Sequence, residues 1–138
     1  MLAASCLCGA VRIEVTGTPR SLSYCHCGRC RKAEGVFATV MIGAAEDLRV
    51  VAGEEAIRRI EPEPPFTHRR AFCGECGSAL GELASGGIYV LAASALDDDP
   101  GIRPSVHIHV ASKPAWYEIT DGLPQYAGDY GGALVGAG

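Results

Sequence analysis

The residues of this chain best suited to chemistry are seven cysteines in three short groups. They are Cys6 and Cys8, then Cys25, Cys27 and Cys30, then Cys73 and Cys76. Thiolates are good zinc ligands, and zinc takes four protein ligands in structural sites and commonly three in catalytic ones. Seven cysteines therefore predict two zinc ions per chain, one in a closed site and one in a site with an open position.

Disulfide bonds are the alternative use of clustered cysteines. The odd count leaves one thiol over, and two cysteines separated by a single residue are badly placed to bridge each other. Residues 1–5 lack the basic region and apolar run of a signal peptide. No stretch approaches the ~20 apolar residues of a membrane span. We therefore expect a cytoplasmic protein with no membrane partner, in which clustered cysteines more often bind metal than form disulfides.

The group at residues 73–76 is Cys-Gly-Glu-Cys followed by Gly77. Two intervening residues let a tight turn aim both sulfur atoms at one metal ion. Gly77 can adopt the left-handed conformation that such a turn often needs. Because this pair supplies only two ligands, two more must come from elsewhere, and we expect the completed site to be structural.

The group at residues 25–30 supplies three thiols from one loop. An extended backbone at 25–27 places Cys25 and Cys27 on one side and His26 on the other. Three ligands leave the fourth tetrahedral position for water or substrate, where zinc could act as a Lewis acid or stabilise a thiolate. The alternative is a closed site whose fourth ligand is a histidine: His26, His68, His107 or His109.

The elements that position these groups are predicted to be short strands. The chain has 138 residues with 18 Gly and 8 Pro, a composition that disfavours long helices. Segments rich in β-branched and aromatic residues alternate with turn residues, which indicates an all-β sandwich or barrel-like fold. We expect strands at 10–16, 22–24, 36–42, 48–52, 55–60, 69–72, 79–83, 88–92 and 106–110, and one helical turn at 29–34.

Two hairpins are predicted from turn residues. One joins 48–52 to 55–60 around Gly53-Glu54, and the other joins 79–83 to 88–92 around Ser85-Gly86-Gly87. Trp116 and Tyr117 are expected to pack in the interior, since buried aromatic rings usually dominate core energetics. The formal net charge of −4 argues against nucleic acid as a partner, because nucleic-acid binding usually needs a basic surface.

The cysteine groups, with the residues around them, resemble the glutathione-dependent formaldehyde-activating enzyme family, also called the centromere protein V family. The resemblance is carried in order by Cys6-x-Cys8-Gly9-Ala10-Val11, Cys25-His26-Cys27-x-x-Cys30-Arg31-Lys32, Phe72-Cys73-x-x-Cys76-Gly77, Pro104-x-x-His107-Ile108, Lys113, Trp116 and Asp121-Gly122-Leu123-Pro124. It extends from Cys6 to Pro124, which is nearly the whole chain.

The resemblance implies an all-β zinc fold of antiparallel sheets, the β-tent. It implies a domain at residues 1–127, followed by a Gly-rich tail at 128–138. It also implies which cysteines share a metal, a choice that spacing leaves open. Cys6, Cys8, Cys73 and Cys76 would close the structural zinc site, and Cys25, Cys27 and Cys30 would hold the catalytic zinc.

The reaction implied by the resemblance is a carbon–sulfur lyase-type condensation of glutathione, or a related thiol, with formaldehyde to S-hydroxymethylglutathione. Its partners would be a small-molecule thiol and an aldehyde. Glutathione carries two carboxylates, so Arg29, Arg31 and Lys32 beside the metal loop are candidate substrate-binding residues; solvated surface charges are the alternative. A non-catalytic, zinc-stabilised binding module of the same fold is the alternative function.

Two histidines lie two residues apart on the strand predicted at 106–110. His107 and His109 should therefore share a face of the sheet. They could line the substrate pocket, move a proton or complete the metal site. The resemblance favours His107 as the substrate-binding residue, and a partly buried structural histidine is the alternative.

Overall fold

The computed structural model describes residues 1–136 and has two β-sheets and one α-helix. In chain order the strands and the helix are β1 (Leu2–Ser5), β2 (Arg12–Val15), β3 (Ser21–Cys25), α1 (Gly28–Glu34), β4 (Ala38–Ala44), β5 (Leu48–Ala52), β6 (Ile57–Ile60), β7 (Arg70–Cys73), β8 (Ala79–Gly81), β9 (Ile88–Ala92) and β10 (His107–Ile108). Short 3-10 turns are η1 (Ala45–Asp47), η2 (Glu54–Ala56), η3 (Ala93–Ala95) and η4 (Val110–Ser112). The predicted all-β class is confirmed.

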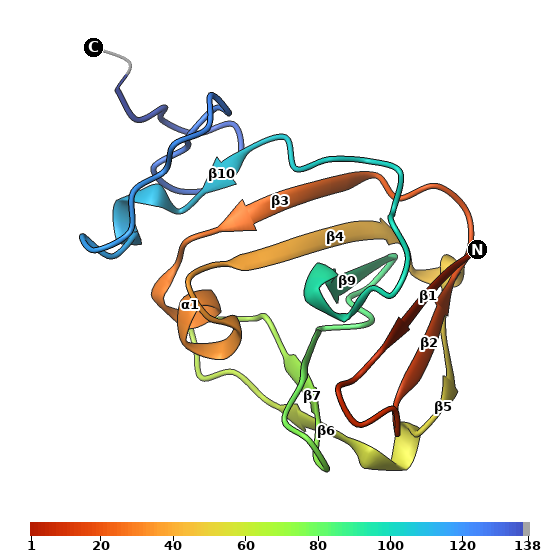
Figure 1. The fold of residues 1–138 in the computed structure, drawn as a ribbon. Coiled ribbons are helices and arrows are strands. Elements are labelled where there is room, and N and C mark those ends of the chain that lie inside the picture. The colour runs from red at the N-terminus through yellow and green to blue at the C-terminus, as the bar shows by residue number, and fades with distance from the viewer. Residues whose placement is uncertain (137–138) are drawn as a thin grey trace.

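The strands form a small sheet and a large one. The small sheet has the order β1-β2-β5, and the large one has the order β10-β3-β4-β9-β8-β7-β6. Every pairing is antiparallel except that of β10 with β3. Figure 1 shows the small sheet leaning against the large one, with α1 at the end of β3 and β4. The arrangement leaves α1 and the loop before it outside the space between the sheets.

The core lies between the two sheets. Strand β2 alternates along its length, so that Ile13 and Val15 are buried while Arg12 is exposed. From the large sheet, Met41 and Leu91 meet them without any exposed surface. A fully buried side chain of this size contributes about 1.5–3 kcal/mol through the hydrophobic effect. The alternation of apolar and polar residues thus packs one face of each sheet against the other, and the two sheets support the cysteine groups.

One close approach in the large sheet requires a glycine. A Cβ atom on Gly43 of β4 would lie 2.3 Å from the ring of Tyr89, the residue paired with it on β9. Tyr89 is almost completely buried. Glycine at this position lets the aromatic ring pack flat across β4, where any larger side chain would push it away.

The hairpin predicted for residues 48–60 is wrong. Strand β5 pairs with β2 in the small sheet, whereas β6 pairs with β7 in the large sheet. Between them Gly53 adopts φ +82° and the chain turns through η2. Strand β5 therefore returns to β2, near the start of the chain, whereas β6 pairs with β7, the next strand along the sequence. The second hairpin is confirmed, with β8 and β9 antiparallel.

Other parts of the described chain depart from expectation in three places. Strand β10 covers only two residues of the predicted 106–110 segment, and β1 was not predicted. Trp116 is exposed over 68% of its surface, so its predicted interior packing is wrong. Tyr117 is half-buried and lies against Phe37.

The C-terminal segment folds back on itself. The amide of Ala127 donates to the carbonyl of Ala133 at 2.8 Å, and Val135 donates to Gln125 at the same distance. Residues 137–138 of the predicted Gly-rich tail lie outside the described residues. None of the helices formed by residues 1–136 is long and apolar enough to cross a membrane.

Candidate metal centres and the adjoining cavity

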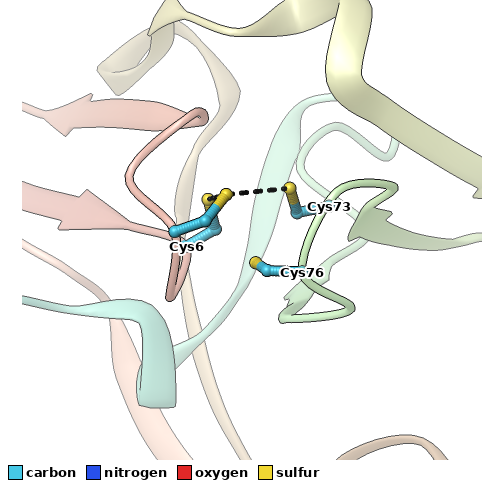
Figure 2. A group of neighbouring side chains, drawn as sticks. Cys6, Cys73 and Cys76 are labelled. Carbon is cyan, nitrogen blue, oxygen red and sulfur yellow. Dashed lines mark hydrogen bonds between the residues drawn. The ribbon is translucent and has the colours of Figure 1, made fainter.

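Four cysteines from two distant parts of the chain meet at one point. Ligand atoms of Cys6, Cys8, Cys73 and Cys76 all lie within 4.8 Å of one another. Figure 2 shows the sulfur atoms of Cys6, Cys73 and Cys76 directed toward one another from the β1–β2 loop and the β7–β8 turn. This cluster is named the four-cysteine cluster.

The spacing of these sulfur atoms suits a tetrahedral zinc ion. The Sγ atoms of Cys6 and Cys8 are 3.6 Å apart, and those of Cys8 and Cys73 are 3.9 Å apart. Zinc–sulfur bonds of about 2.3 Å in tetrahedral geometry place neighbouring sulfur atoms roughly 3.8 Å apart. A disulfide would need about 2.05 Å, and all seven cysteines are free. The donor set therefore fits a closed metal site.

Backbone turns and hydrogen bonds hold the cysteines of the four-cysteine cluster close together. The predicted left-handed glycine is confirmed: Gly77 has φ +81° and its amide donates to the Cys73 carbonyl at 2.7 Å. The hydroxyl of Ser78 accepts from the amide of Leu7 at 2.8 Å, which ties the two loops together. Ser78 hydrogen bonds also lower the pKa of Cys76 to about 5. One thiolate is thus favoured before any metal binds.

The other three cysteines form a second cluster, named the three-cysteine cluster. Ligand atoms of Cys25, Cys27 and Cys30 lie within 4.8 Å of one another. Cys25 ends β3, Cys27 is the N-cap of α1 and Cys30 lies in the first turn of the helix. The Cys27 sulfur accepts a hydrogen bond from the Cys30 amide at 3.2 Å. One strand end and one helix start therefore bring all three sulfur atoms together.

The three thiols strongly perturb one another. Hydrogen bonds from Cys25 and Cys30 lower the pKa of Cys27. Hydrogen bonds shared with Cys27 and Cys30, together with burial, raise the pKa of Cys25. Like charges this close cannot all ionise unless a cation compensates them. Three thiolates here require a positive ion, and a divalent metal of zinc's preferences fits.

Within residues 1–136 no histidine joins the three-cysteine cluster as a fourth ligand. His68 Nδ1 instead lies 3.0 Å from a Glu82 carboxylate oxygen, and His109 Nε2 lies 3.0 Å from one of Asp129. The cluster borders a cavity of about 1070 Å³, which all three cysteines line. This arrangement favours a site with an open position facing the cavity.

The predicted basic residues lie at this cavity. Arg29, Arg31 and Lys32 of α1 all line it. The guanidinium of Arg29 sits over the ring of Phe66 at 4.1 Å, so that α1 and the loop before β7 meet at the cavity's edge. Arg70 of β7 adds a further cation and donates to the Cys30 sulfur at 3.7 Å. The cavity therefore has one strongly basic wall.

Glu34 was not identified from the sequence. It ends α1, lines the same cavity, and has one buried carboxylate oxygen without a hydrogen-bond partner within the described residues. Burial raises its pKa to about 7; the Cys27 sulfur adds to this effect and Arg70 opposes it. A carboxyl group that exchanges protons near neutral pH is suited to general acid–base chemistry. Only its position four residues after Cys30 could have indicated it.

The two histidines predicted to share a face do not share one. His109 has a left-handed backbone with φ +55°, which ends β10 and turns its side chain to the cavity lining. His107 is 1% exposed, and it instead contacts His26 in the loop that carries Cys25 and Cys27. The structure does not bring His107 to the cavity where substrate binding was predicted.

His107 belongs to a buried hydrogen-bonded chain. Its Nε2 lies 3.0 Å from both oxygens of Asp121, and its Nδ1 lies 2.8 Å from Nε2 of His26. Burial, with the neighbouring imidazole of His107, lowers the pKa of His26 to about 4. With neutral rings, His107 donates to the carboxylate and His26 donates to His107. These hydrogen bonds hold the Cys25–Cys27 loop in place through His26, its middle residue.

Comparisons with known proteins agree with this picture. The chain is similar to a Rhodobacter sphaeroides protein of known crystal structure, with 29% sequence identity and a TM-score of 0.54. That match covers 74% of this chain and 91% of the other. No curated protein sequence matches the chain. The family model described as glutathione-dependent formaldehyde-activating enzyme matches residues 1–112, and the chain therefore belongs to that family.

Proposed function

We propose that this protein is a zinc-dependent enzyme that joins glutathione, or a related thiol, to formaldehyde and forms S-hydroxymethylglutathione. The observation that carries the proposal is the three-cysteine cluster, whose three sulfur atoms border a cavity with a basic wall and no fourth protein ligand within residues 1–136. Family membership supports the choice of thiol and aldehyde. The reverse direction would be a carbon–sulfur lyase reaction.

Two zinc ions would have different duties. Cys6, Cys8, Cys73 and Cys76 would hold one in a closed site that fastens the sheets together. Cys25, Cys27 and Cys30 would hold the other beside the cavity. Zinc bound there would supply a Lewis acid that favours a thiolate or polarises a carbonyl group.

Substrate binding would depend on the basic wall. Arg29, Arg31 and Lys32 would bind the two carboxylates of glutathione and leave its thiol directed at the three-cysteine cluster. Holding thiol and aldehyde together replaces a bimolecular encounter with a local one, which lowers the entropic barrier. His107 would act from behind, by holding His26 and so the loop that carries Cys25 and Cys27.

Proton movement would depend on Glu34. The thiol must lose a proton before its sulfur attacks the carbonyl carbon, and the resulting alkoxide must gain one. The Glu34 carboxylate would accept the first proton and return it to the oxygen, which keeps the reaction balanced. Its raised pKa of about 7 suits it to both steps at neutral pH.

The test is thiol-dependent formaldehyde consumption by freshly purified, reduced protein with its zinc content measured in parallel. We expect two zinc ions per chain and faster exchange between formaldehyde and the glutathione adduct, followed by NMR, than in the absence of protein. A chain that binds two zinc ions and accelerates the reaction of no thiol would instead be a zinc-stabilised binding module.

A further inference from the structure

An apolar strip continues the cavity away from the three-cysteine cluster. Val40 and Ile42 of β4 and Val90 of β9 line the cavity and are partly exposed. Ile108 of β10, which is paired with Cys25, lies at the end of the strip beside the cluster. The strand neighbours Met41 on β4 and Leu91 on β9 point the other way into the core, where they have no exposed surface. The strip is therefore the outer face of the large sheet and is not part of the packed interior.

Sheet register fixes where the strip begins and how far it reaches. Cys25 pairs with Ala38 on β4, and Ile42 lies four residues further along that strand beside Val90 on β9. A strand rises about 3.3 Å per residue, so Ile42 lies roughly 13 Å along the sheet from the level of Cys25. In Figure 1 α1 lies at one end of β3 and β4, and the strands extend away from it.

The cationic side chains of the cavity lie at its helix end, and the apolar side chains lie along the sheet. The cationic side chains Arg29, Arg31 and Lys32 come from α1, on the helix side of the three-cysteine cluster. Within the described residues, β4 and β9 contribute no charged side chain to the cavity lining. A ligand that fills this cavity would carry its anionic groups at one end and hydrocarbon at the other.

Formaldehyde leaves this strip unused, since its only carbon must sit at the reacting sulfur. A cavity of about 1070 Å³ is slightly larger than the range of roughly 300–1000 Å³ that holds drug-sized ligands. Resting on the proposed function, we propose that the strip binds the hydrocarbon substituent of a larger aldehyde. The substrate class is then alkyl and aryl aldehydes, with formaldehyde as its smallest member.

The chemistry stays balanced for every member of this class. The thiol sulfur bonds to the carbonyl carbon, the π electrons of the carbonyl group move to its oxygen, and the proton released by the thiol ends on that oxygen. The product is an S-(1-hydroxyalkyl) thiol adduct. No oxidant or further reactant is consumed.

Stable adduct analogues test the strip without depending on turnover. S-methyl-, S-butyl- and S-hexylglutathione carry the anionic end and a tail of increasing length. We expect calorimetric affinity for the zinc-loaded protein to rise roughly fourfold per added methylene, the effect of burying each from water. The binding heat capacity should become more negative along the series.

Matched variants locate the effect. Val40→Thr and Val90→Thr place a hydroxyl on the strip at nearly unchanged size, and we expect them to weaken S-hexylglutathione binding several-fold while leaving S-methylglutathione unchanged. Val51→Thr is the control, because Val51 lies on β5 in the other sheet and is 43% exposed. It should leave the whole series as in the parent.

Two results would overturn the proposal. One is a binding affinity that does not change from S-methyl- to S-hexylglutathione. This result counts against the proposal even if sedimentation shows that a second copy of the chain covers the strip. The other is a chain-length gain that Val40→Thr and Val90→Thr leave intact. Failure of the proposed function has a different signature: no formaldehyde turnover, with the chain-length gain and its loss in the variants preserved.

Discussion

The two cysteine clusters use the same ligand chemistry in opposite structural settings. The four-cysteine cluster joins loops whose cysteines are 65 residues apart in sequence, as Cys8 and Cys73 show. The three-cysteine cluster comes from six consecutive residues and borders a cavity. A metal that links distant segments restricts the whole chain, whereas a metal held by one loop restricts little. Stability should therefore depend mainly on the first cluster, and activity on the second.

The largest expected effect is loss of the fold in Cys73→Ser. Cys73 has no exposed surface, and structural zinc in small domains supplies on the order of 10 kcal/mol of folding free energy. A whole domain has only about 5–15 kcal/mol of stability. We expect the variant to be unfolded or to melt at a far lower temperature, by circular dichroism, and to lose zinc. Unchanged melting with two zinc ions would contradict the assigned role of this cluster.

Cys27→Ser should separate activity from stability. Serine is a good helix N-cap, so it can replace the sulfur that accepts from the Cys30 amide and keep the start of α1. One metal ligand is nevertheless lost. Changes to groups that merely support ligands cost about 10–100-fold, and we expect at least that loss in turnover. Thermal melting should shift by only a few degrees, with one zinc ion retained.

A drop in stability as large as that of Cys73→Ser would remove the distinction between the clusters. The pair of variants is therefore best measured together, under identical reducing conditions.

Glu34→Gln should lower activity and raise stability at alkaline pH. We expect roughly a 10²-fold loss of turnover, in the range found for general bases. In the parent, activity should rise with pH through a midpoint between the ordinary 4.5 and about 7, because the carboxylate form accepts the proton. A zinc ion nearby would move that midpoint toward the lower value.

The stability effect of Glu34 has the opposite sign. The folded protein holds the Glu34 proton to a higher pH than the unfolded chain does, so stability falls as pH rises from about 4.5 to 7. Because glutamine cannot ionise, the Glu34→Gln variant does not lose stability in this way as pH rises. Melting at pH 8 should therefore favour Glu34→Gln over the parent, while the exposed control Glu55→Gln changes neither property. An unchanged pH profile in Glu34→Gln would remove Glu34 from the reaction.

The smallest expected effects concern the basic wall. Lys32→Ala should raise the KM for glutathione roughly threefold to tenfold and leave kcat nearly unchanged, since a remote carboxylate contact acts equally before and at the transition state. Added salt should shrink the difference, because the side chain is exposed. Arg49→Ala, an exposed cation on β5, serves as the control. Equal KM values for parent and Lys32→Ala would show that this charge is only solvated.

Local patterns in the sequence predicted what depends on neighbouring residues. The helical turn at 29–34 became α1 with nearly the same bounds, and Gly77 has the expected left-handed backbone. Both follow from the preferences of a few adjacent residues. The grouping of the cysteines agrees with what the family resemblance implied.

Features that depend on distant partners were missed. Strands β5 and β6 belong to different sheets although only four residues separate them, because β5 pairs with β2, near the start of the chain, whereas β6 pairs with β7, the strand that follows it. His109 leaves the face of His107 through one backbone angle that no side-chain pattern indicates. Arg70 is an ordinary charged residue in sequence, and only the packing of β7 near α1 brings it to the sulfur of Cys30. Glu34 lies on the same helix as Cys30, but its burial, which depends on the surrounding fold, is not visible in the sequence.

The β1–β2 loop and the β7–β8 turn are separated by a long stretch of chain, and this has a consequence for biosynthesis. At about 5–20 residues per second, several seconds pass between the appearance of Cys8 and that of Cys73, 65 residues later. During that interval the nascent chain carries two thiols with half a binding site. The supply of zinc and the reducing environment at the ribosome would then decide whether those thiols stay free until Cys73 and Cys76 are synthesised, or react with other molecules first.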